Sequence, residues 1–300
     1  MPQGWPAASC EWTGSWSVVS SRGDLHTHSN CSDGRLSPTA LVELAVARGV
    51  QIMALTDHDS VEGIPEAAAA ASRYRDFTLV PGVEMSTDIP SGEVHMLGYF
   101  LDPKDGILRA ELAALRDARR DRGYLMVQKL RDMGKDISWE RVQALAGGGS
   151  VGRPHIAQAL LEKGHIGSLQ EAFESYIGRN GPAYVERTKM SPVETVAFLS
   201  QRGTMPVLAH PRELEDLEGL LPDLLRAGLV GMEVYYQDYD EAAIERLLSI
   251  ARKYSLVPTG GSDYHGLGGE HERLPGDIPL PDEAVDTFMA LAERYVTHKT

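Results

Sequence analysis

Two histidines one residue apart stand in the stretch DLHTHSNCSDG at residues 24–34, and an aspartate follows them closely. Side chains two positions apart on a strand point to the same face, so His26 and His28 would lie side by side there. Together with Asp33 they form either a polar face of one strand or part of a metal site. Neutral imidazole and carboxylate are both ordinary ligands of divalent ions.

Other histidines and carboxylates stand at or just beyond short apolar runs of the kind typical of buried strands. His58 follows QIMALT, Glu84 follows FTLV, His210 ends MPVLAH, and Asp263 and His265 follow LVPTGG. Each of them alone is compatible with an ordinary polar turn or a strand-end loop. Their shared position at strand ends is what favours a joint metal site.

Seven β-rich runs are predicted as strands, and helical patterns separate most of them at 37–49, 61–74, 191–203 and 240–255. This alternation predicts parallel βαβ units, and seven units favour a (β/α) barrel over an open sheet. In such barrels the carboxyl ends of the strands meet on one face. The predicted strands are 23–28, 51–56, 77–82, 94–100, 205–210, 229–236 and 256–261.

His95 is the exception, because it stands at the start of its run, VHMLGYF, beside Glu93. A short or bent strand would be needed to bring it to the same face. With His95 the candidate set has nine members, too many for one ion and suited to two or three. No cysteine belongs to the set, which argues against a structural zinc knuckle.

The alternation stops between about 103 and 190, where helical patterns at 107–134 and 153–164 dominate. This segment carries 15 Lys or Arg against 11 Asp or Glu, a net charge of +4, whereas the remainder carries −18. We therefore expect a discontinuous barrel at 22–102 and 191–300, with a helical insertion at 103–190 that covers the active site. A mildly basic insertion could supply positive groups to an anionic substrate.

The composition and charge of the chain limit the partners and the cellular compartment that can be expected. The net charge of −14 argues against a broad basic surface for nucleic acid. Residues 1–21 have neither a positive n-region nor an apolar h-region and are expected to be a loose extension rather than a signal peptide. Two cysteines, Cys10 and Cys31, are too few for a disulfide framework and favour a reduced, cytoplasmic setting. No apolar run is long enough for a transmembrane helix.

The ordered motifs HTHSNCSDG, TDHD, PGVE, HMLGYF, AHP and GSDYH resemble the PHP (polymerase and histidinol phosphatase) superfamily of metal-dependent phosphoesterases. The resemblance runs from residue 23 to about 270. It is strongest to the branch of 3′,5′-nucleoside bisphosphate phosphatases and 5′-3′ exoribonucleases, which GRPHIA (152–157) and GRNGPAYV (178–185) also resemble. It implies a distorted (β/α)7 barrel with up to three divalent ions, manganese first and iron, zinc or magnesium as alternatives.

The resemblance also implies how the nine ligands divide. His26, His28 and Asp263 would hold the first ion, and Glu84 would bridge it to the second. His95 and His210 would complete the second ion's ligands. The third ion would be held by Asp33, His58 and His265. A metal-bound hydroxide held by Glu84, Asp263 and His210 would then attack phosphorus in line.

Substrate phosphate would be contacted from the insertion. Arg153 and His155 resemble family residues of this kind, and Arg179 could act in the same way, since a guanidinium grips phosphate with two hydrogen bonds. Arg153 could instead be a solvated residue at a helix N-terminus, and His155 a polar residue of the first helical turn. Asp57, Asp59 and Glu233 are interpreted as structural or supporting, and Cys31 as a small filler.

The predicted function is removal of the 3′-phosphate from nucleoside 3′,5′-bisphosphates, with 5′-3′ exonuclease action on short single-stranded RNA as a second activity. The small-molecule alternatives are histidinol-phosphate phosphatase and cyclic-phosphate phosphodiesterase. A non-catalytic, metal-stabilised module is the alternative from a different class, and it would have lost ligands. The expected partner is a nucleotide, with no membrane and no obligate protein partner.

Overall fold

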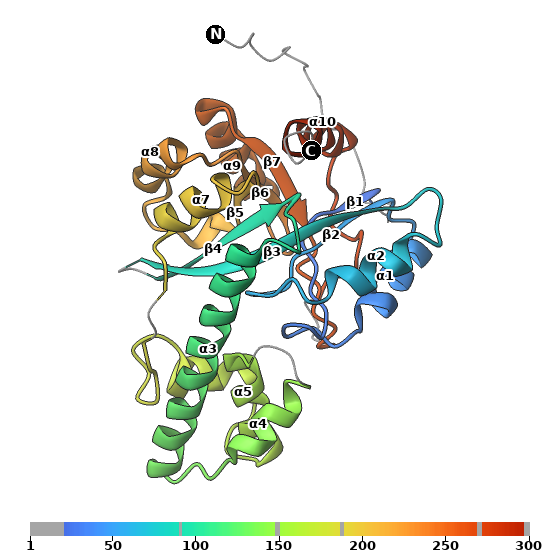
Figure 1. Cartoon of the computed structure of the whole chain (residues 1–300). Helices are drawn as coiled ribbons and strands as arrows, with labels where there is room; N and C mark the ends of the chain where they lie inside the picture. The colour runs from blue at the N-terminus through green and yellow to red at the C-terminus, as the bar shows by residue number, and fades with distance from the viewer. Residues whose placement is uncertain (1–20, 90–91, 148–150, 187–188, 269–271, 297–300) are drawn as a thin grey trace.

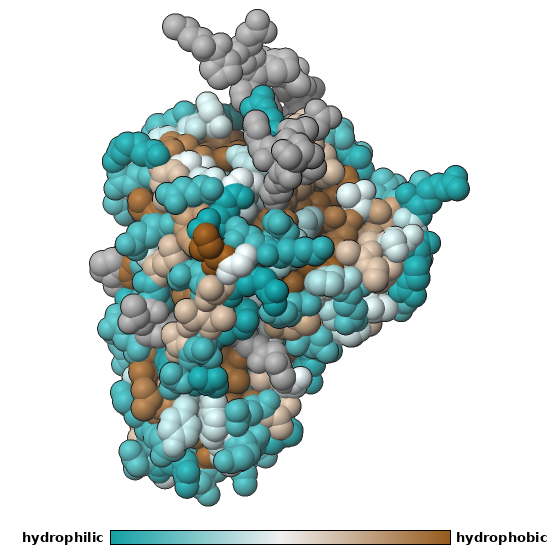
Figure 2. All heavy atoms as spheres, in the orientation of Figure 1, coloured by the Kyte–Doolittle hydropathy of each residue, from teal (hydrophilic) through white to brown (hydrophobic). Residues whose placement is uncertain are grey.

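The computed structural model describes residues 21–89, 92–147, 151–186, 189–268 and 272–296. The trace at 1–20 lies outside them, so the expectation of a loose extension at residues 1–21 falls almost wholly beyond the described part. Helices surround one sheet, and a group of further helices extends from one end of it (Figure 1). The face seen in Figure 2 is largely hydrophilic. No helix within the described ranges has the length and apolar character needed to cross a membrane.

Seven strands form one sheet in chain order, and the sheet curls into a barrel. Across the seam between the first and last strands, the Leu25 amide donates to Gly260 O at 3.1 Å and the His28 amide donates to Tyr264 O at 3.0 Å. The (β/α)7 barrel predicted from the sequence is therefore confirmed. Its strands are β1 (Gly23–Asp24), β2 (Ile52–Leu55), β3 (Thr78–Ile89), β4 (Gly92–Tyr99), β5 (Met205–Leu208), β6 (Gly231–Tyr236) and β7 (Val257–Gly261).

The strand directions correct one expectation, because the sheet is not parallel throughout. β4 pairs antiparallel with both β3 and β5, while the other pairs are parallel. Only two residues separate β3 from β4, and Ile89 pairs with Gly92, so no crossover helix intervenes. The start of β4 therefore lies beside the carboxyl ends of its neighbours. His95 reaches the site from a regular strand, opposite Ser86, and needs no short or bent one.

Five helices pack around the barrel, namely α1 (Pro38–Ala47), α2 (Ile64–Ala71), α7 (Pro192–Ser200), α8 (Leu217–Ala227) and α9 (Glu241–Tyr254). Ser37 caps α1 as its sequence predicts, since its hydroxyl accepts from the Ala40 amide. Ser191 and Glu194 form a capping box on α7. A short 3-10 turn, η2 (Pro211–Glu213), follows His210.

Helix α10 (Asp282–Val296) packs at the end of the barrel away from the strand ends that carry the histidines (Figure 1). Its Phe288 is fully buried, and its ring lies 5.0 Å from that of Tyr99 and 5.1 Å from that of Phe100. Tyr99 ends β4 and pairs with Met205 at the start of β5, which places this cluster at the opposite end from His95.

The helices between β4 and α7 build a second apolar cluster. They are α3 (Gly106–Asp132), α4 (Trp139–Leu145), α5 (Arg153–Glu162), α6 (Leu169–Ala172) and the π-helical turn η1 (Phe173–Ile177). α3 belongs to both parts, since Leu108 and Leu112 join the barrel core while Met126 and Leu130 join the second cluster. The division into a discontinuous barrel and an insertion at 103–190 stays a prediction.

We expect Phe288→Ala to destabilise the fold by about 3–5 kcal/mol, because a large aromatic side chain leaves a cavity at the closed end of the barrel. Urea unfolding followed by circular dichroism measures this change. Glu283→Ala, on the exposed side of the same helix, is the control and should stay within about 0.5 kcal/mol of wild type. Equal stability of both variants would show that α10 does not seal the barrel.

Candidate metal centre

The structure brings the nine sequence-predicted ligands into one continuous cluster at the histidine-bearing end of the barrel. The loop after β1 supplies three of them, and single residues come from the loop after β2, from β3, from β4 and from the end of β5. The segment after β7 supplies the last two. In chain order they are His26, His28, Asp33, His58, Glu84, His95, His210, Asp263 and His265.

Glu84 is the centre of the cluster, and its side chain is only 1% exposed. Five imidazoles surround its carboxylate. Oε2 lies 3.2 Å from His26 Nε2, 3.2 Å from His28 Nε2 and 3.1 Å from His58 Nδ1, and Oε1 lies 2.7 Å from His95 Nδ1 and 3.2 Å from His210 Nε2. Glu84 is therefore placed where it would contribute to binding more than one ion.

Asp263 faces the first two histidines. Its Oδ1 lies 3.2 Å from His26 Nε2 and 3.0 Å from His28 Nε2, and its Oδ2 accepts a hydrogen bond from the Tyr236 hydroxyl at 2.7 Å. His26, His28, Glu84 and Asp263 together form a four-ligand group.

Asp33 gathers a second group with His28, His58 and His265. Its Oδ1 lies 3.3 Å from His265 Nε2 and 3.9 Å from His28 Nδ1, and its Oδ2 lies 3.9 Å from His58 Nε2. His58, Glu84 and His95 form a third group. His28, His58 and Glu84 each belong to two of these groups, so the three candidate groups share ligands.

Besides the types of side chain in the cluster, the burial of their polar atoms also fits the binding of divalent ions. Several buried polar atoms of the cluster have no hydrogen-bond partner among the described residues, although burial without a partner is costly. A cation is the partner that would satisfy nitrogen and carboxylate lone pairs aimed at shared space. These atoms are His26 Nε2, His28 Nδ1 and Nε2, Asp33 Oδ1, His58 Nδ1 and Glu84 Oε2.

Electrostatics keep the carboxylates ionised. Burial would raise the pKa of Glu84, but the imidazoles of His58, His26 and His95 outweigh it and hold this pKa well below its ordinary value. Burial would likewise lower the pKa of His265, yet Asp33 and Asp263 raise it to about 10. The carboxylates thus favour protonated imidazoles in the absence of metal, and a divalent ion bound here would displace those protons.

Some ligands sit on unusual backbone. His210 has φ 27° and Asp263 has φ 51°, in the left-handed region that side-chain-bearing residues rarely adopt. Asp59, next to His58, has φ 50°. Such conformations persist where the surroundings hold them and cluster at functional sites. They turn the chain sharply at the carboxyl ends of β5 and β7 and so aim the side chains inward.

Asp57 holds the loop that carries Asp33. Asp57 Oδ1 accepts from the Ser29 amide at 2.7 Å and from the Ser32 hydroxyl at 2.6 Å, and its Oδ2 accepts from the Ser29 hydroxyl at 2.7 Å. These bonds fix the loop between His28 and Asp33. Burial raises the pKa of the nearby Cys31 thiol, which disfavours a thiolate ligand.

Among the candidate phosphate contacts, the two arginines are engaged by carboxylates outside the nine candidate ligands, whereas His155 lies near enough to Asp33 and His265 to be influenced by their charges. Arg153 is paired with Glu93, and Arg179 Nη1 lies 3.0 Å from Asp88 Oδ1, so both arginines are held by carboxylates of the β3–β4 hairpin. His155 Nδ1 accepts from the Gly152 amide at 2.9 Å, and burial lowers the pKa of this imidazole.

Three further cations lie near these contacts, and sequence reasoning did not single them out. Arg119 Nη2 donates to Asp59 Oδ2 at 2.9 Å and to Ser86 Oγ at 2.6 Å. Lys189 Nζ lies 2.5 Å and Arg122 Nη1 3.6 Å from Glu93 Oε1. The spacing of 119 and 122 on one face of α3 was the available signal.

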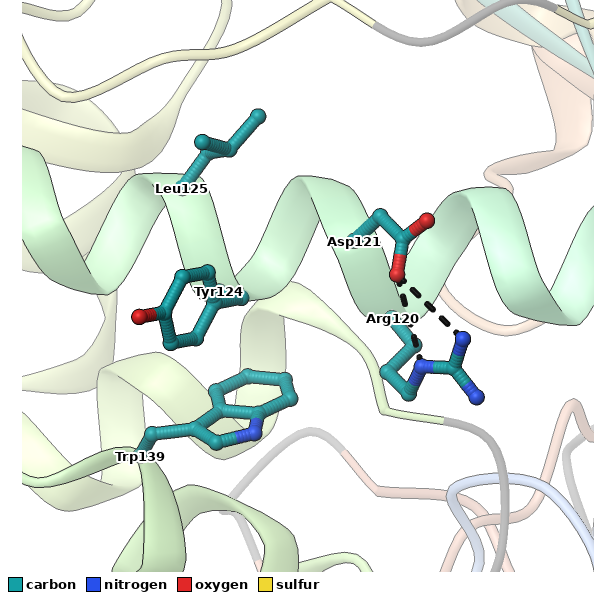
Figure 3. Close-up of a pocket in the computed structure, with 5 residues that line it drawn as sticks. All are labelled: Arg120, Asp121, Tyr124, Leu125 and Trp139. Carbon is teal, nitrogen blue, oxygen red and sulfur yellow. Dashed lines mark hydrogen bonds and ion pairs between the residues drawn. The ribbon is translucent and has the colours of Figure 1, made fainter.

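A separate hollow of about 270 Å³ lies on the outer side of α3 (Figure 3). It is lined by Arg120, Asp121, Tyr124, Leu125 and Trp139, and it contains none of the nine candidate ligands. On a helix these α3 positions face away from Arg119 and Arg122. The hollow is therefore not an extension of the candidate metal centre.

We expect Glu84→Gln to lose at least one bound divalent ion and to lower kcat/KM on phosphate esters by about 1000-fold or more, since a bridging carboxylate is worth several kcal/mol. Elemental analysis after gel filtration and phosphate release measure both effects. Glu43→Gln, an exposed carboxylate paired with Arg73, is the control. Unchanged metal content in Glu84→Gln would refute the ligand assignment.

The chain is similar to a known protein family and to several named proteins. A PHP-domain family model matches residues 24–181. The 3′,5′-nucleoside bisphosphate phosphatase of Chromobacterium violaceum is 32% identical over 85% of this chain and 92% of its own length. The 5′-3′ exoribonuclease Rnm of Salmonella typhimurium is 32% identical over 81% of this chain and 84% of its own length.

Two further relatives extend the comparison. The phosphoribosyl 1,2-cyclic phosphate 1,2-diphosphodiesterase of Eggerthella lenta is 31% identical over 85% of this chain and 98% of its own length. A solved structure described as a metal-dependent phosphoesterase, from Bifidobacterium adolescentis, has a TM-score of 0.80 and 30% identity, over 89% of this chain and 95% of that one. The family model spans more than half of the chain, and relatives that act on phosphate esters align along most of it. The chain therefore belongs to the PHP family and is a metal-dependent hydrolase of phosphate esters, not a non-catalytic module.

Proposed function

We propose that this phosphoesterase removes the 3′-phosphate from nucleoside 3′,5′-bisphosphates. The observation that carries the proposal is a group of largely buried cations that share Glu93, two residues from the candidate ligand His95, where they could hold a second phosphate. We call Arg122, Arg153 and Lys189 the insertion cation cluster. The Chromobacterium violaceum relative, named for this activity, supports the same substrate class.

The insertion cation cluster borders the metal centre through β4. Glu93 and His95 are two positions apart on this strand, so their side chains lie on one face. The Glu93 carboxylate is shared by all three cations. Arg153, Lys189 and His95 hold its pKa well below the ordinary value against the effect of burial. Arg122 is 5% exposed, and burial lowers its pKa to about 10. Its Nη1 makes no hydrogen bond within the described part of the chain.

A phosphate dianion is the ligand that such a group of cations favours. Guanidinium groups bind phosphate oxygens through charge-assisted, paired hydrogen bonds. A substrate with one phosphate at the candidate metal centre and a second at the cation cluster would satisfy both sites. Arg153 is the residue that the sequence and this geometry share. Arg179 is paired with Asp88, which lies directly opposite Glu93 across the hairpin, but it does not share the Glu93 carboxylate.

The metal ions, when bound, would activate water and stabilise negative charge on the phosphate oxygens. The nine candidate ligands hold them, and manganese remains the predicted ion. The cation cluster orients the ester by gripping its other phosphate, which turns binding energy into correct placement. The predicted insertion at 103–190 thereby acts as a substrate-holding cover.

Exonuclease action on the 5′ end of short RNA is the second candidate, and the Salmonella typhimurium relative favours it. A 5′-phosphorylated oligonucleotide would use the same cation cluster. Histidinol phosphate offers no second phosphate and would leave the cluster without its anion. A cyclic phosphodiesterase activity is favoured only by the name of the Eggerthella lenta relative.

We expect manganese-loaded protein to release phosphate from 3′-phosphoadenosine 5′-phosphate at least about 100-fold faster, in kcat/KM, than from 5′-AMP or histidinol phosphate, since two charge-assisted contacts contribute about 1.5–3 kcal/mol each. Malachite-green detection of phosphate measures all three rates. Asp263→Ala is the inactive control. Preferred turnover of histidinol phosphate would contradict the proposal.

We also expect Arg153→Met to lower kcat/KM for the bisphosphate by about 30-fold, the loss of about 2 kcal/mol of phosphate binding. Turnover of 3′-AMP, which lacks the second phosphate, should change less than about threefold. Arg141→Met, which removes a half-exposed arginine paired with Glu162, is the matched control. An equal loss on both substrates would mean that Arg153 supports the fold or the metal centre instead.

A further inference from the structure

Strand β6 carries none of the nine candidate ligands, yet its side chains contact three of them. The strand lies between β5, which leads to His210, and β7, which leads to Asp263. Two of its polar residues, Glu233 and Tyr236, face the metal centre.

Glu233 is fully buried and uses each carboxylate oxygen for a different ligand. Its Oε1 lies 3.0 Å from His26 Nδ1, and its Oε2 accepts from the backbone amide of His210 at 2.8 Å. Because an ionised carboxylate can only accept, the first contact places a proton on His26 Nδ1, and Nε2, which lies near Glu84 and Asp263, is the atom that would bind a metal ion. The second contact holds the backbone of His210, whose φ is 27°.

A β-bulge explains why Tyr236 shares this face with Glu233. In regular alternation, residues 233 and 235 would point the same way. The pairing with β7 shifts between Glu233 and Tyr235, so that Glu233 opposes Thr259 while Tyr235 opposes the next residue, Gly260. Bulges re-aim side chains in this way beside active sites. The Tyr236 hydroxyl accordingly donates to Asp263 Oδ2 at 2.7 Å.

We infer that β6 is a positioning strand: Glu233 sets the tautomer of His26 and the backbone of His210, and Tyr236 orients the carboxylate of Asp263. Three candidate ligands from three other parts of the barrel are thereby arranged around one template. Residues behind the ligands commonly fix them in this way and affect metal affinity. The inference rests on the proposed ligand assignment but not on the choice of substrate.

Glu233→Gln and Tyr236→Phe test the inference with little change of volume. A glutamine amide in place of the Glu233 carboxylate can accept only one of the two hydrogen bonds and presents N–H to the other donor. Thr259→Val is the matched control, because Thr259 pairs with Glu233, is equally buried, and touches none of the nine ligands through its hydroxyl. Manganese affinity by calorimetry, the visible spectrum of the cobalt-substituted protein, and thermal unfolding of the metal-free protein are measured for each.

We expect about 10–100-fold weaker manganese binding in Glu233→Gln, a smaller loss in Tyr236→Phe, altered cobalt spectra in both, and wild-type values in Thr259→Val. On the bisphosphate, kcat should fall while KM changes less than about threefold. Wild-type metal affinity and spectra in both variants would overturn the inference, whatever their thermal stability. Should Glu233→Gln fail to fold, Tyr236→Phe alone decides. Wild-type protein that binds no manganese would overturn the ligand assignment together with this inference.

Discussion

The interaction on which the site depends is the burial of one carboxylate, Glu84, among five imidazoles. A carboxylate taken out of water is costly unless charge or hydrogen bonds replace its hydration. Here the imidazoles do so in part, and several ring nitrogens still lack hydrogen-bond partners within the described part of the chain. The barrel has to keep the Glu84 carboxylate and the imidazoles in place, because these polar side chains would otherwise turn toward water. Its closed sheet, and the packing of α10 at the far end, supply that rigidity.

The antiparallel direction of β4 links the candidate metal centre to the predicted insertion. Because the strand runs against its neighbours, its first residues, Glu93 and His95, stand at the edge where the other strands end. The imidazole of His95 contacts the carboxylate of Glu84, while the carboxylate of Glu93 pairs with the arginines and lysine of the insertion cation cluster. One strand thus carries a candidate metal ligand and the anchor of the candidate phosphate site. A parallel strand would have placed both residues at the closed end of the barrel.

Much of the site could be predicted from sequence because the relevant signal is local. A histidine or carboxylate just beyond an apolar run lies at a strand end, and strand ends meet in a barrel. The direction of β4 was not predictable in this way, since alternation has the same period of two in either direction. Helix α8 was missed; it contains Pro222, which weakens its pattern. Buried Arg119 and Arg122 look like solvated helix residues in the sequence. The partners of Glu233 are distant along the chain, so its role also required the structure.

The insertion cation cluster sets a balance between binding and release under the proposed function. Glu93 already satisfies part of its charge, so an incoming phosphate has to compete with a carboxylate rather than fill an empty cationic site. Competition lowers the affinity for phosphate, and a product that keeps its 5′-phosphate can leave more readily. It also raises selectivity, since a singly charged ester gains little by displacing Glu93, whereas a dianion regains the full interaction with two guanidinium groups. Under this proposal Glu93, which neutralises part of the charge of the insertion cation cluster in the absence of substrate, also determines which anions bind there long enough to react.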